Sequence, residues 1–301
     1  MNISITANYF WQKRGCNTRR TPDERIKITA DAGFKFMDYA VNVWDDEWEA
    51  QTDEIMNAAA KYGIIIDQSH APFNFYKKAP REVFDKMLDR SVESAIKMGV
   101  KNLVFHADEY RPPEGTPFNS EEGVLQVYDV LAPHIEKLTK GGVKAALETV
   151  FEDKTLKPVE GNRYHFCGDI NELIAVIDKF NDPMVGCCWD SGHTKLNVGN
   201  DGHVDALRRL GSRIIATHIH DNYYGKDLHL QPFMGDANWD ELMPALKATG
   251  YDGSLTFELV YGCMHEELIP AWLDQLYRTG ELLRDMLCIF TMAFLLDYCF
   301  F

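Results

Sequence analysis

Residues 184–190 read MVGCCWD, residues 214–220 read IIATHIH and residues 254–260 read SLTFELV. Each stretch is a nearly continuous run of apolar residues that carries a charged or imidazole side chain at or near its end. Runs of this length and composition are typical of parallel β-strands that are buried on both faces of a sheet. Because the segments between them have the period of helices, this half of the chain predicts strand–helix–strand units.

The same pattern extends back to the start of the chain. Five further strand-like runs lie at residues 3–10, 34–41, 64–70, 102–106 and 143–150. Helix-like segments between the strands include residues 22–32, 80–98, 121–140, 169–180 and 239–249. Eight such units, with no glycine-rich GxGxxG loop after the first strand, favour a closed barrel over an open doubly wound sheet. We therefore predict an α/β fold: a single (β/α)8 TIM barrel, with a parallel eight-stranded barrel inside a ring of helices.

The whole of residues 1–285 is predicted to form this one domain, because a chain of 301 residues is an ordinary length for such a barrel. The final residues 286–301 read MLCIFTMAFLLDYCFF. This stretch is apolar, but it is short for a membrane span and is interrupted by Asp297. We expect an appended tail or a helix that contacts a partner, and its role is left open.

Composition and charge limit the class of partner. The formal net charge of −15 repels phosphate backbones, which favours a small-molecule substrate over nucleic acid. The seven cysteines lack paired CxxC spacing, which indicates reduced thiols rather than a disulfide framework or a structural zinc site. The first residues, MNISITANYFWQKRGC, lack the apolar core of a signal peptide. We therefore expect a cytoplasmic protein that does not associate with a membrane.

Six consecutive predicted strands, the third to the eighth, end in residue types that bind metal ions. Because the carboxyl ends of parallel strands converge on one face of a barrel, these side chains would meet there. A lone histidine or glutamate at a strand end is more often a hydrogen-bonded structural residue, but six in succession make coincidence improbable. The residues at these ends, with two from the loop after the seventh strand, are His70, His106, Glu148, Asp190, His193, His218, His220, Asp227, His229 and Glu258.

Two glutamates of this set follow apolar runs, Glu148 after KAAL and Glu258 after LTF. An unpaired buried carboxylate is costly, so a cation partner is the natural resolution. Side-chain alternation puts His218 and His220 on the same side of their strand, with His220 nearer the rim. Carboxylates and imidazoles suit a divalent ion. We therefore predict a metal site formed by Glu148, Asp190, His220 and Glu258, with His218 packed below the metal.

Other polar side chains near the strand ends are expected to contact the substrate. His193 lies three residues beyond Asp190, where it would position a substrate hydroxyl or orient Glu148. The predicted substrate-binding residues are His70, His106, His193, Asp227, His229, Lys226 and Trp11, with Arg163 as a further loop residue at the mouth. The remaining histidines considered, His134, His203 and His265, are predicted to lie at the surface.

The motifs HAPFNF, ALETVF, CWDSGH, THIHDN, KDLHLQPFMGDANWDEL and YDGSLTFEL are similar to those of a known family. Over residues 1–285 the chain resembles the xylose isomerase-like barrels, the sugar phosphate isomerase/epimerase family. The resemblance implies a divalent-metal cofactor, with Mn²⁺ favoured over Mg²⁺, Co²⁺ or Zn²⁺, held at Glu148, Asp190, His220 and Glu258. It also implies a carbohydrate substrate, Glu148 and Glu258 as acid and base, and a homo-oligomer.

The expected reaction is proton transfer next to a carbonyl, through an enediolate whose negative charge the metal stabilises. Exchange of the proton between the two faces of the substrate gives epimerisation, and its return to the neighbouring carbon gives isomerisation. The sequence does not distinguish a free sugar from a sugar phosphate, since a phosphate needs a basic or amide-rich loop that the sequence does not place.

Three alternatives stay open. Dehydratases of the inosose and dehydroshikimate kind, which the fold resembles, begin with the same proton abstraction and then expel water. The type-IV apurinic endonucleases hold three zinc ions through nine ligands, and the matching positions here are His70, His106, Glu148, Asp190, His193, His220, Asp227, His229 and Glu258. Against the nuclease, this chain has HAPFNFYKKAP and PFMGDANW where those enzymes have a longer first motif and a GEG turn. A non-enzymatic role, as a sugar-binding protein or a scaffold, is the third alternative.

Overall fold

The structure, a computed structural model, describes residues 1–7, 20–74, 79–108, 110, 116, 119–151, 166–260 and 264–296, with side chains up to residue 287. Eight parallel strands form one sheet in the order β10-β1-β2-β3-β4-β5-β6-β7. They are β1 (Asn2–Thr6), β2 (Phe36–Asp38), β3 (Ile65–His70), β4 (Asn102–His106), β5 (Lys144–Glu148), β6 (Val185–Asp190), β7 (Ile214–His218) and β10 (Ser254–Phe257).

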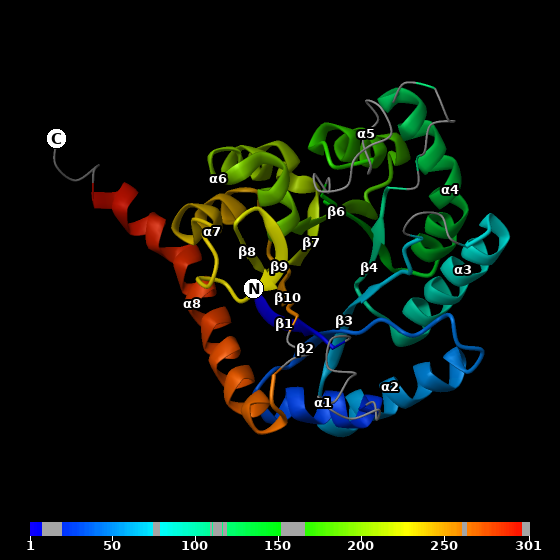
Figure 1. Cartoon of the computed structure of the whole chain (residues 1–301), viewed down its shortest axis with the longest axis horizontal. Helices are drawn as coiled ribbons and strands as arrows, with labels where there is room; N and C mark the ends of the chain where they lie inside the picture. The colour runs from blue at the N-terminus through cyan, green and yellow to red at the C-terminus, as the bar shows by residue number, and fades with distance from the viewer. Residues whose placement is uncertain are drawn as a thin grey trace.

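Helices surround this sheet, so the predicted (β/α)8 TIM barrel is confirmed (Figure 1). They are α1 (Pro22–Asp31), α2 (Trp48–Tyr62), α3 (Arg81–Met98), α4 (Ser120–Lys140), α5 (Ile170–Phe180), α6 (Ser191–Leu210), α7 (Trp239–Ala248) and α8 (Ile269–Leu296), with 3-10 turns η3 (Gly211–Arg213) and η4 (Glu266–Leu268). Helices α2, α6 and α8 were not delimited from the sequence. The predicted loop after the seventh strand is an antiparallel hairpin of β8 (Asp221–Tyr223) and β9 (Lys226–Leu230).

The barrel closes between β7 and β10, the two ends of the sheet order. Ile219, just beyond β7, forms an isolated parallel bridge with Phe257. The hydroxyl of Thr217 donates to the carbonyl of Ser254 at 2.8 Å and accepts from the amide of Thr256 at 3.3 Å. Between β7 and β10 these bonds pair backbone groups that elsewhere in the barrel are paired by hydrogen bonds between neighbouring strands. Closure brings the ends of β7 and β10 onto the same face of the barrel.

A layer of small and medium apolar side chains fills the middle of the barrel. Four buried residues, Val104, Ala146, Cys188 and Ala216, form their own cluster, separate from the larger core that includes the neighbouring strand residues. Side chains two residues apart on a strand share a face. The residues directly above this layer are therefore His106, Glu148, Asp190 and His218.

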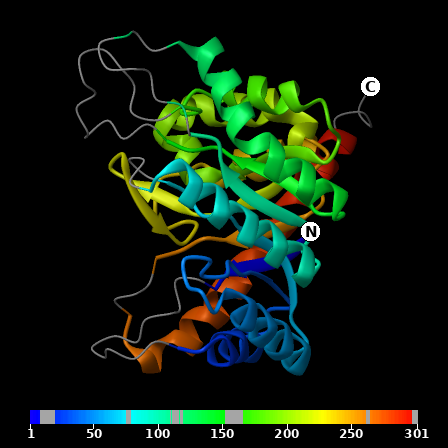
Figure 2. The ribbon, with the colours of Figure 1, turned by 90° about the vertical axis from the view of Figure 1, so that its right-hand side faces the viewer.

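The carboxyl ends of the strands form one face of the barrel, and the predicted metal-binding residue types lie on this face. The hairpin β8–β9 projects on this side, away from the N-terminus (Figure 2). The helix that follows β6 begins at once, because Asp190 caps α6 by accepting from the amide of His193 at 2.6 Å. The motif SGH is therefore the first turn of a helix. This turn fixes the directions of the Asp190 and His193 side chains.

The last helix, α8, runs through Leu296, so the first part of the predicted tail is continuous with it. Its final turns extend beyond the ring of helices (Figure 1). No helix in the described part of the chain combines the length and apolar character needed to cross a bilayer.

Two histidines that were predicted at the surface are buried. His134 contacts Asp89 at 2.9 Å, and His203 is 1% exposed beside Trp189. Helical sequence alone did not show which face of α4 and α6 they occupy. His265 is exposed, as predicted, and caps η4.

Candidate active site

Three carboxylates converge on one imidazole at the end of β7. Nδ1 of His218 lies 3.3 Å from Glu258 Oε2, 3.4 Å from Glu148 Oε1 and 3.9 Å from Asp190 Oδ2. One ligand atom from each of these four residues lies within 4.8 Å of the others, a spacing that fits one metal ion. Both ring nitrogens of His218 are buried without a hydrogen-bond partner among the described atoms. Such nitrogens beside three carboxylates fit a cation better than they fit a closed hydrogen-bond network.

The position of His218 differs from the sequence-based prediction, which assigned His220 to this group. In the structure His218 is the last residue of β7 and faces inward above Ala216, whereas the strand has ended before His220. The ring of His220 packs against Gly192, where a Cβ would come within 1.9 Å of the ring. Its Nε2 lies 2.9 Å from Asp190 Oδ1. The prediction of His220 extended the side-chain alternation of the strand to a residue that lies beyond the end of β7, where the alternation no longer applies.

A second group extends the site toward β3 and β4. Nε2 of His70 lies 3.0 Å from Glu148 Oε2, and Nε2 of His106 lies 3.3 Å from the same oxygen. These three residues also have the mutual spacing of metal ligands. Glu148 therefore belongs to two groups, one through each carboxylate oxygen. The ring of Phe73 stacks on His106 with centroids 4.6 Å apart and covers this group.

A third group is formed where the hairpin β8–β9 folds over α6. Oδ2 of Asp227 lies 3.2 Å from His229 Nε2 and 3.7 Å from His193 Nε2. The rings of His220 and His229 stack with centroids 3.9 Å apart. These four residues have ligand atoms within 4.8 Å of one another. The hairpin thus brings two of the predicted substrate-binding residues, Asp227 and His229, next to His193.

Charge shapes the protonation of these residues. Burial by itself would raise the pKa of Glu148, but the charges of His218 and His106, with hydrogen bonds from His106 and His193, hold that pKa well below its ordinary value. Burial disfavours a charged His229, yet its hydrogen bond to Asp227 and the charge of Glu258 raise its pKa to about 9. In the protein without a metal, protonated imidazoles therefore balance the carboxylates. A divalent cation would supply the same balance.

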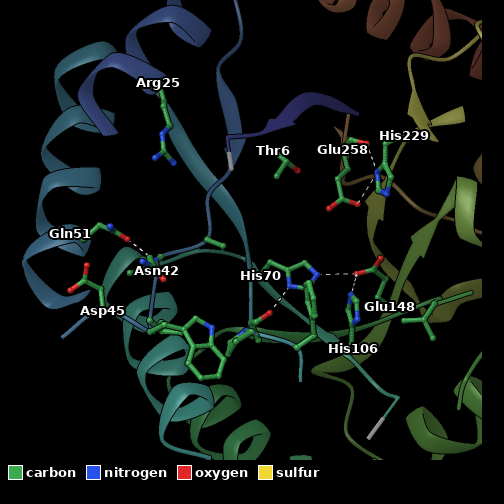
Figure 3. A pocket seen from close by; sticks show the side chains of 18 of the residues that line it. Thr6, Arg25, Asn42, Asp45, Gln51, His70, His106, Glu148, His229 and Glu258 are labelled. Atoms are coloured by element: carbon green, nitrogen blue, oxygen red, sulfur yellow. Dashed lines mark hydrogen bonds and ion pairs between the residues drawn. The ribbon is translucent and has the colours of Figure 1, made fainter. Parts of the chain in front are cut away.

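The groups lie at one end of a cavity of about 880 Å³. His70, His106, Glu148, His193, Asp227, His229 and Glu258 all line it, and Figure 3 shows five of them around the same space. Lys226 does not lie with them: it is exposed at the start of β9 and is not among the described residues that line the cavity. Trp11 and Arg163 lie outside the described residues.

Further polar and aromatic residues, which were not predicted from the sequence, lie beside the site. Asp38 at the end of β2 is fully buried, and its Oδ2 lies 3.5 Å from His218 Nε2. The side-chain amide of Gln68 donates to the same oxygen at 2.8 Å. Asp38 is a carboxylate at a strand end, which was a usable signal. Trp44, Asn42 and Arg25 line the far end of the cavity, and nothing in their sequence context marks them.

Comparison with known proteins gives the same architecture. A family model described as xylose isomerase-like TIM barrel matches residues 26–279. An uncharacterized protein of Sinorhizobium fredii, y4fM, is 33% identical over 177 residues, which are 58% of this chain and 51% of that protein. The match therefore spans about half the length of this relative.

Solved structures with the same fold include a D-tagatose 3-epimerase-like protein, with a TM-score of 0.72 and 19% identity over 97% of this chain and 99% of the other. A D-psicose 3-epimerase solved in the presence of D-fructose has a TM-score of 0.70 and 15% identity, covering 94% of this chain and 99% of the other. Since the family model covers most of the chain, this protein belongs to the xylose isomerase-like TIM-barrel family.

Proposed function

We propose that this protein is a divalent-metal-dependent isomerase or epimerase that acts on a sugar or a closely related polyhydroxy carbonyl compound. The observation that carries the proposal is the convergence of Glu148, at the end of β5, and Glu258, just after β10, with Asp190 and His218 beside one cavity. The names of the structural neighbours, sugar 3-epimerases among them, support the same substrate class.

The residues that would hold the cation are Glu148, Asp190, His218 and Glu258, with Mn²⁺ as the proposed ion. When bound, a divalent ion in this position polarises a substrate carbonyl and stabilises negative charge on its oxygen. The substrate reaches this point from the cavity, which Glu148 and Glu258 both line, whereas Asp190 and His218 are fully buried below it.

The two glutamates are the proposed acid and base. Glu258 is 12% exposed and is placed to take a proton from the carbon next to the carbonyl. Glu148, held by His70, His106 and His193, is placed to serve the other face of the substrate. His193 and His229 line the cavity and are the proposed contacts for a substrate hydroxyl.

The test is solvent deuterium incorporation. Purified protein loaded with Mn²⁺ is incubated in D₂O with a panel of ketoses, and the sugars are analysed by NMR. We expect deuterium at the carbon next to the carbonyl, together with an epimer or an isomer of the starting sugar. Deuterium exchange with loss of water would instead identify a dehydratase. No exchange with any carbohydrate would contradict the proposal.

A second candidate function rests on the three groups of ligands taken together. One group would hold one ion, and all three groups would suit a trinuclear centre of the kind used to hydrolyse phosphodiesters. Metal analysis separates the two candidates, because about one ion per chain favours sugar chemistry. Three ions per chain, with cleavage of DNA that contains an abasic site, would favour the hydrolase.

A further inference from the structure

The cavity continues well past the three groups of ligands. Its far end is formed by the segment between β2 and α2 and by the start of α1. Figure 3 shows Asn42, Asp45, Gln51 and Arg25 across the cavity from the glutamates. The cavity volume of about 880 Å³ is near the upper end of the roughly 300–1,000 Å³ that is usual for small-molecule sites. The space is therefore larger than proton transfer on a single small sugar requires.

The segment between β2 and α2 is held in place from two sides. The guanidinium of Arg90, on α3, donates to the carbonyl of Val43 at 2.9 Å and contacts Asp46 at 2.8 Å. The side-chain oxygen of Gln51, on α2, accepts from the backbone amide of Asn42 at 2.6 Å. A loop held by bonds to two helices presents its side chains in fixed positions.

This fixed segment leaves a large aromatic side chain uncovered. Trp44 is 50% exposed and forms part of the cavity wall. A tryptophan combines a broad apolar face with low conformational freedom, and in a binding cavity such a face typically contacts a ligand. The apolar C–H face of a sugar ring is the part of a carbohydrate that matches a flat aromatic surface. Trp44 is thus a platform rather than a core residue.

The polar groups beside Trp44 suit hydroxyls better than they suit an anion. Arg20 is paired with Glu266, and the carboxylate of Asp45, the amide of Asn42 and the guanidinium of Arg25 all line this end of the cavity. The Nε of Arg25 donates to the carbonyl of Arg20 at 3.1 Å, which fixes the direction of the guanidinium. Both donor and acceptor groups therefore line this end of the cavity. Sugar hydroxyls both donate and accept, whereas a phosphate only accepts at this site.

We propose that this end of the cavity is a second sugar-binding subsite, formed by Trp44, Asn42, Asp45 and Arg25. The substrate is then a disaccharide or another glycoside: one ring reacts at the glutamates and the second stacks on Trp44. This inference rests on the proposed function for the identity of the reacting end. It does not depend on which carbon of the first ring exchanges its proton.

Calorimetric titration of the Mn²⁺-loaded protein tests the subsite. The probes are D-glucose and D-fructose, compared with maltose, cellobiose, lactulose and sucrose. At least one disaccharide should bind about tenfold more tightly than either monosaccharide, a factor that corresponds to 1.4 kcal/mol. Trp44→Ala should remove that advantage without weakening monosaccharide binding, and Trp44→Phe should retain most of it. Tyr224→Ala is the matched control, because Tyr224 is 79% exposed and is not among the described residues that line the cavity.

A second variant guards against misfolding of Trp44→Ala. Asn42→Ala should also weaken the disaccharide selectively, since the loop is held through the backbone of Asn42 and not through its amide side chain. The inference is overturned if no disaccharide binds more tightly than the monosaccharides, or if Trp44→Ala weakens both equally. Turnover is followed in parallel. Turnover of free ketoses without disaccharide binding removes the subsite alone, and Trp44-dependent binding with no proton exchange on any bound sugar removes the proposed reaction alone.

Discussion

Two acidic residues inside the barrel have pKa values shifted in opposite directions, although both side chains are almost completely buried. Glu148 is 1% exposed at the carboxyl ends of the strands, and Asp67 is 4% exposed deeper in the barrel. Asp67 accepts from the hydroxyls of Ser4, at 3.3 Å, and Ser254. Because β3 is not adjacent to β1 or β10 in the sheet, these bonds cross the barrel interior.

The difference between the two pKa values arises from the groups that surround each carboxylate. Burial raises the pKa of Asp67 to about 6, because hydroxyl donors lower it too little to compensate. The pKa of Glu148 is lowered instead, because the charges of His218 and His106 outweigh the same effect of burial. A buried carboxylate alone therefore does not mark a reactive site. What distinguishes Glu148 from Asp67 is the group of imidazoles around it, whose positive charge a bound cation would supply instead.

Removal of Glu258, which is one of the two proposed acid–base residues, should have the largest effect on turnover. Glu258→Gln keeps the size of the side chain but cannot take up or release a proton at neutral pH, so kcat should fall by about 10²–10⁴. The deuterium-exchange assay measures the loss, and circular dichroism checks that the fold is retained. Asp67→Asn serves as the control and should keep wild-type kcat. Unchanged turnover in Glu258→Gln would contradict the mechanism.

Cation binding by Glu148, Asp190, His218 and Glu258 should stabilise the folded protein. With free Mn²⁺ at about 100 times its Kd, linkage adds about 2.7 kcal/mol, which raises Tm by roughly 5 °C or more. Thermal melts with and without EDTA measure the shift. His218→Ala should abolish it, whereas His265→Ala, which changes an exposed residue, should not. A shift of the same size in both variants would mean that the metal binds elsewhere.

Asp38 should act through His218 rather than on the substrate. Its carboxylate faces His218 Nε2 at 3.5 Å and would keep the proton on that nitrogen, leaving Nδ1 free for the metal. Asp38→Asn should therefore weaken Mn²⁺ binding about 10–100-fold, as measured by competition with a chelator. The melting temperature of the metal-free variant separates this effect from a loss of folding. An affinity equal to that of Asp67→Asn would show that Asp38 has no positioning role.

The lower carboxylate should affect only the pH dependence of stability. The folded pKa of Asp67, about 6, lies above its ordinary value of 3.8, so the folded state retains this proton to a higher pH. Its contribution to stability is complete below about pH 4 and is lost as the pH rises through about 6. Asp67→Asn should therefore gain about 1–2 kcal/mol relative to wild type between pH 4.5 and 7.5, as measured by urea unfolding. A constant difference across this range would contradict the pKa assignment.

Much of the architecture was predictable because parallel strands are read from long apolar runs. The expected strand at 102–106 coincides with β4, and that at 64–70 with β3 to within one residue. The hairpin β8–β9 was not predicted, since its short strands lack an apolar run. It is stabilised by the bond from the Leu228 amide to Asn222 Oδ1 within the hairpin and by the ion pair of Asp221 with Lys195 on α6. The ligand-type residues were predictable as a set, because barrel closure brings strand ends together wherever the strands are placed correctly.

Local periodicity and strand order were sufficient to predict the barrel and the face of the barrel on which carboxylates and imidazoles gather. The folded structure shows that His218, and not His220, faces Glu148 and Glu258, because this depends on where β7 ends and on the space left by Gly192. It also placed Trp44 and Arg25 in the same cavity as the glutamates. Contacts between residues so far apart in the chain arise from closure of the barrel, and no local pattern encodes them.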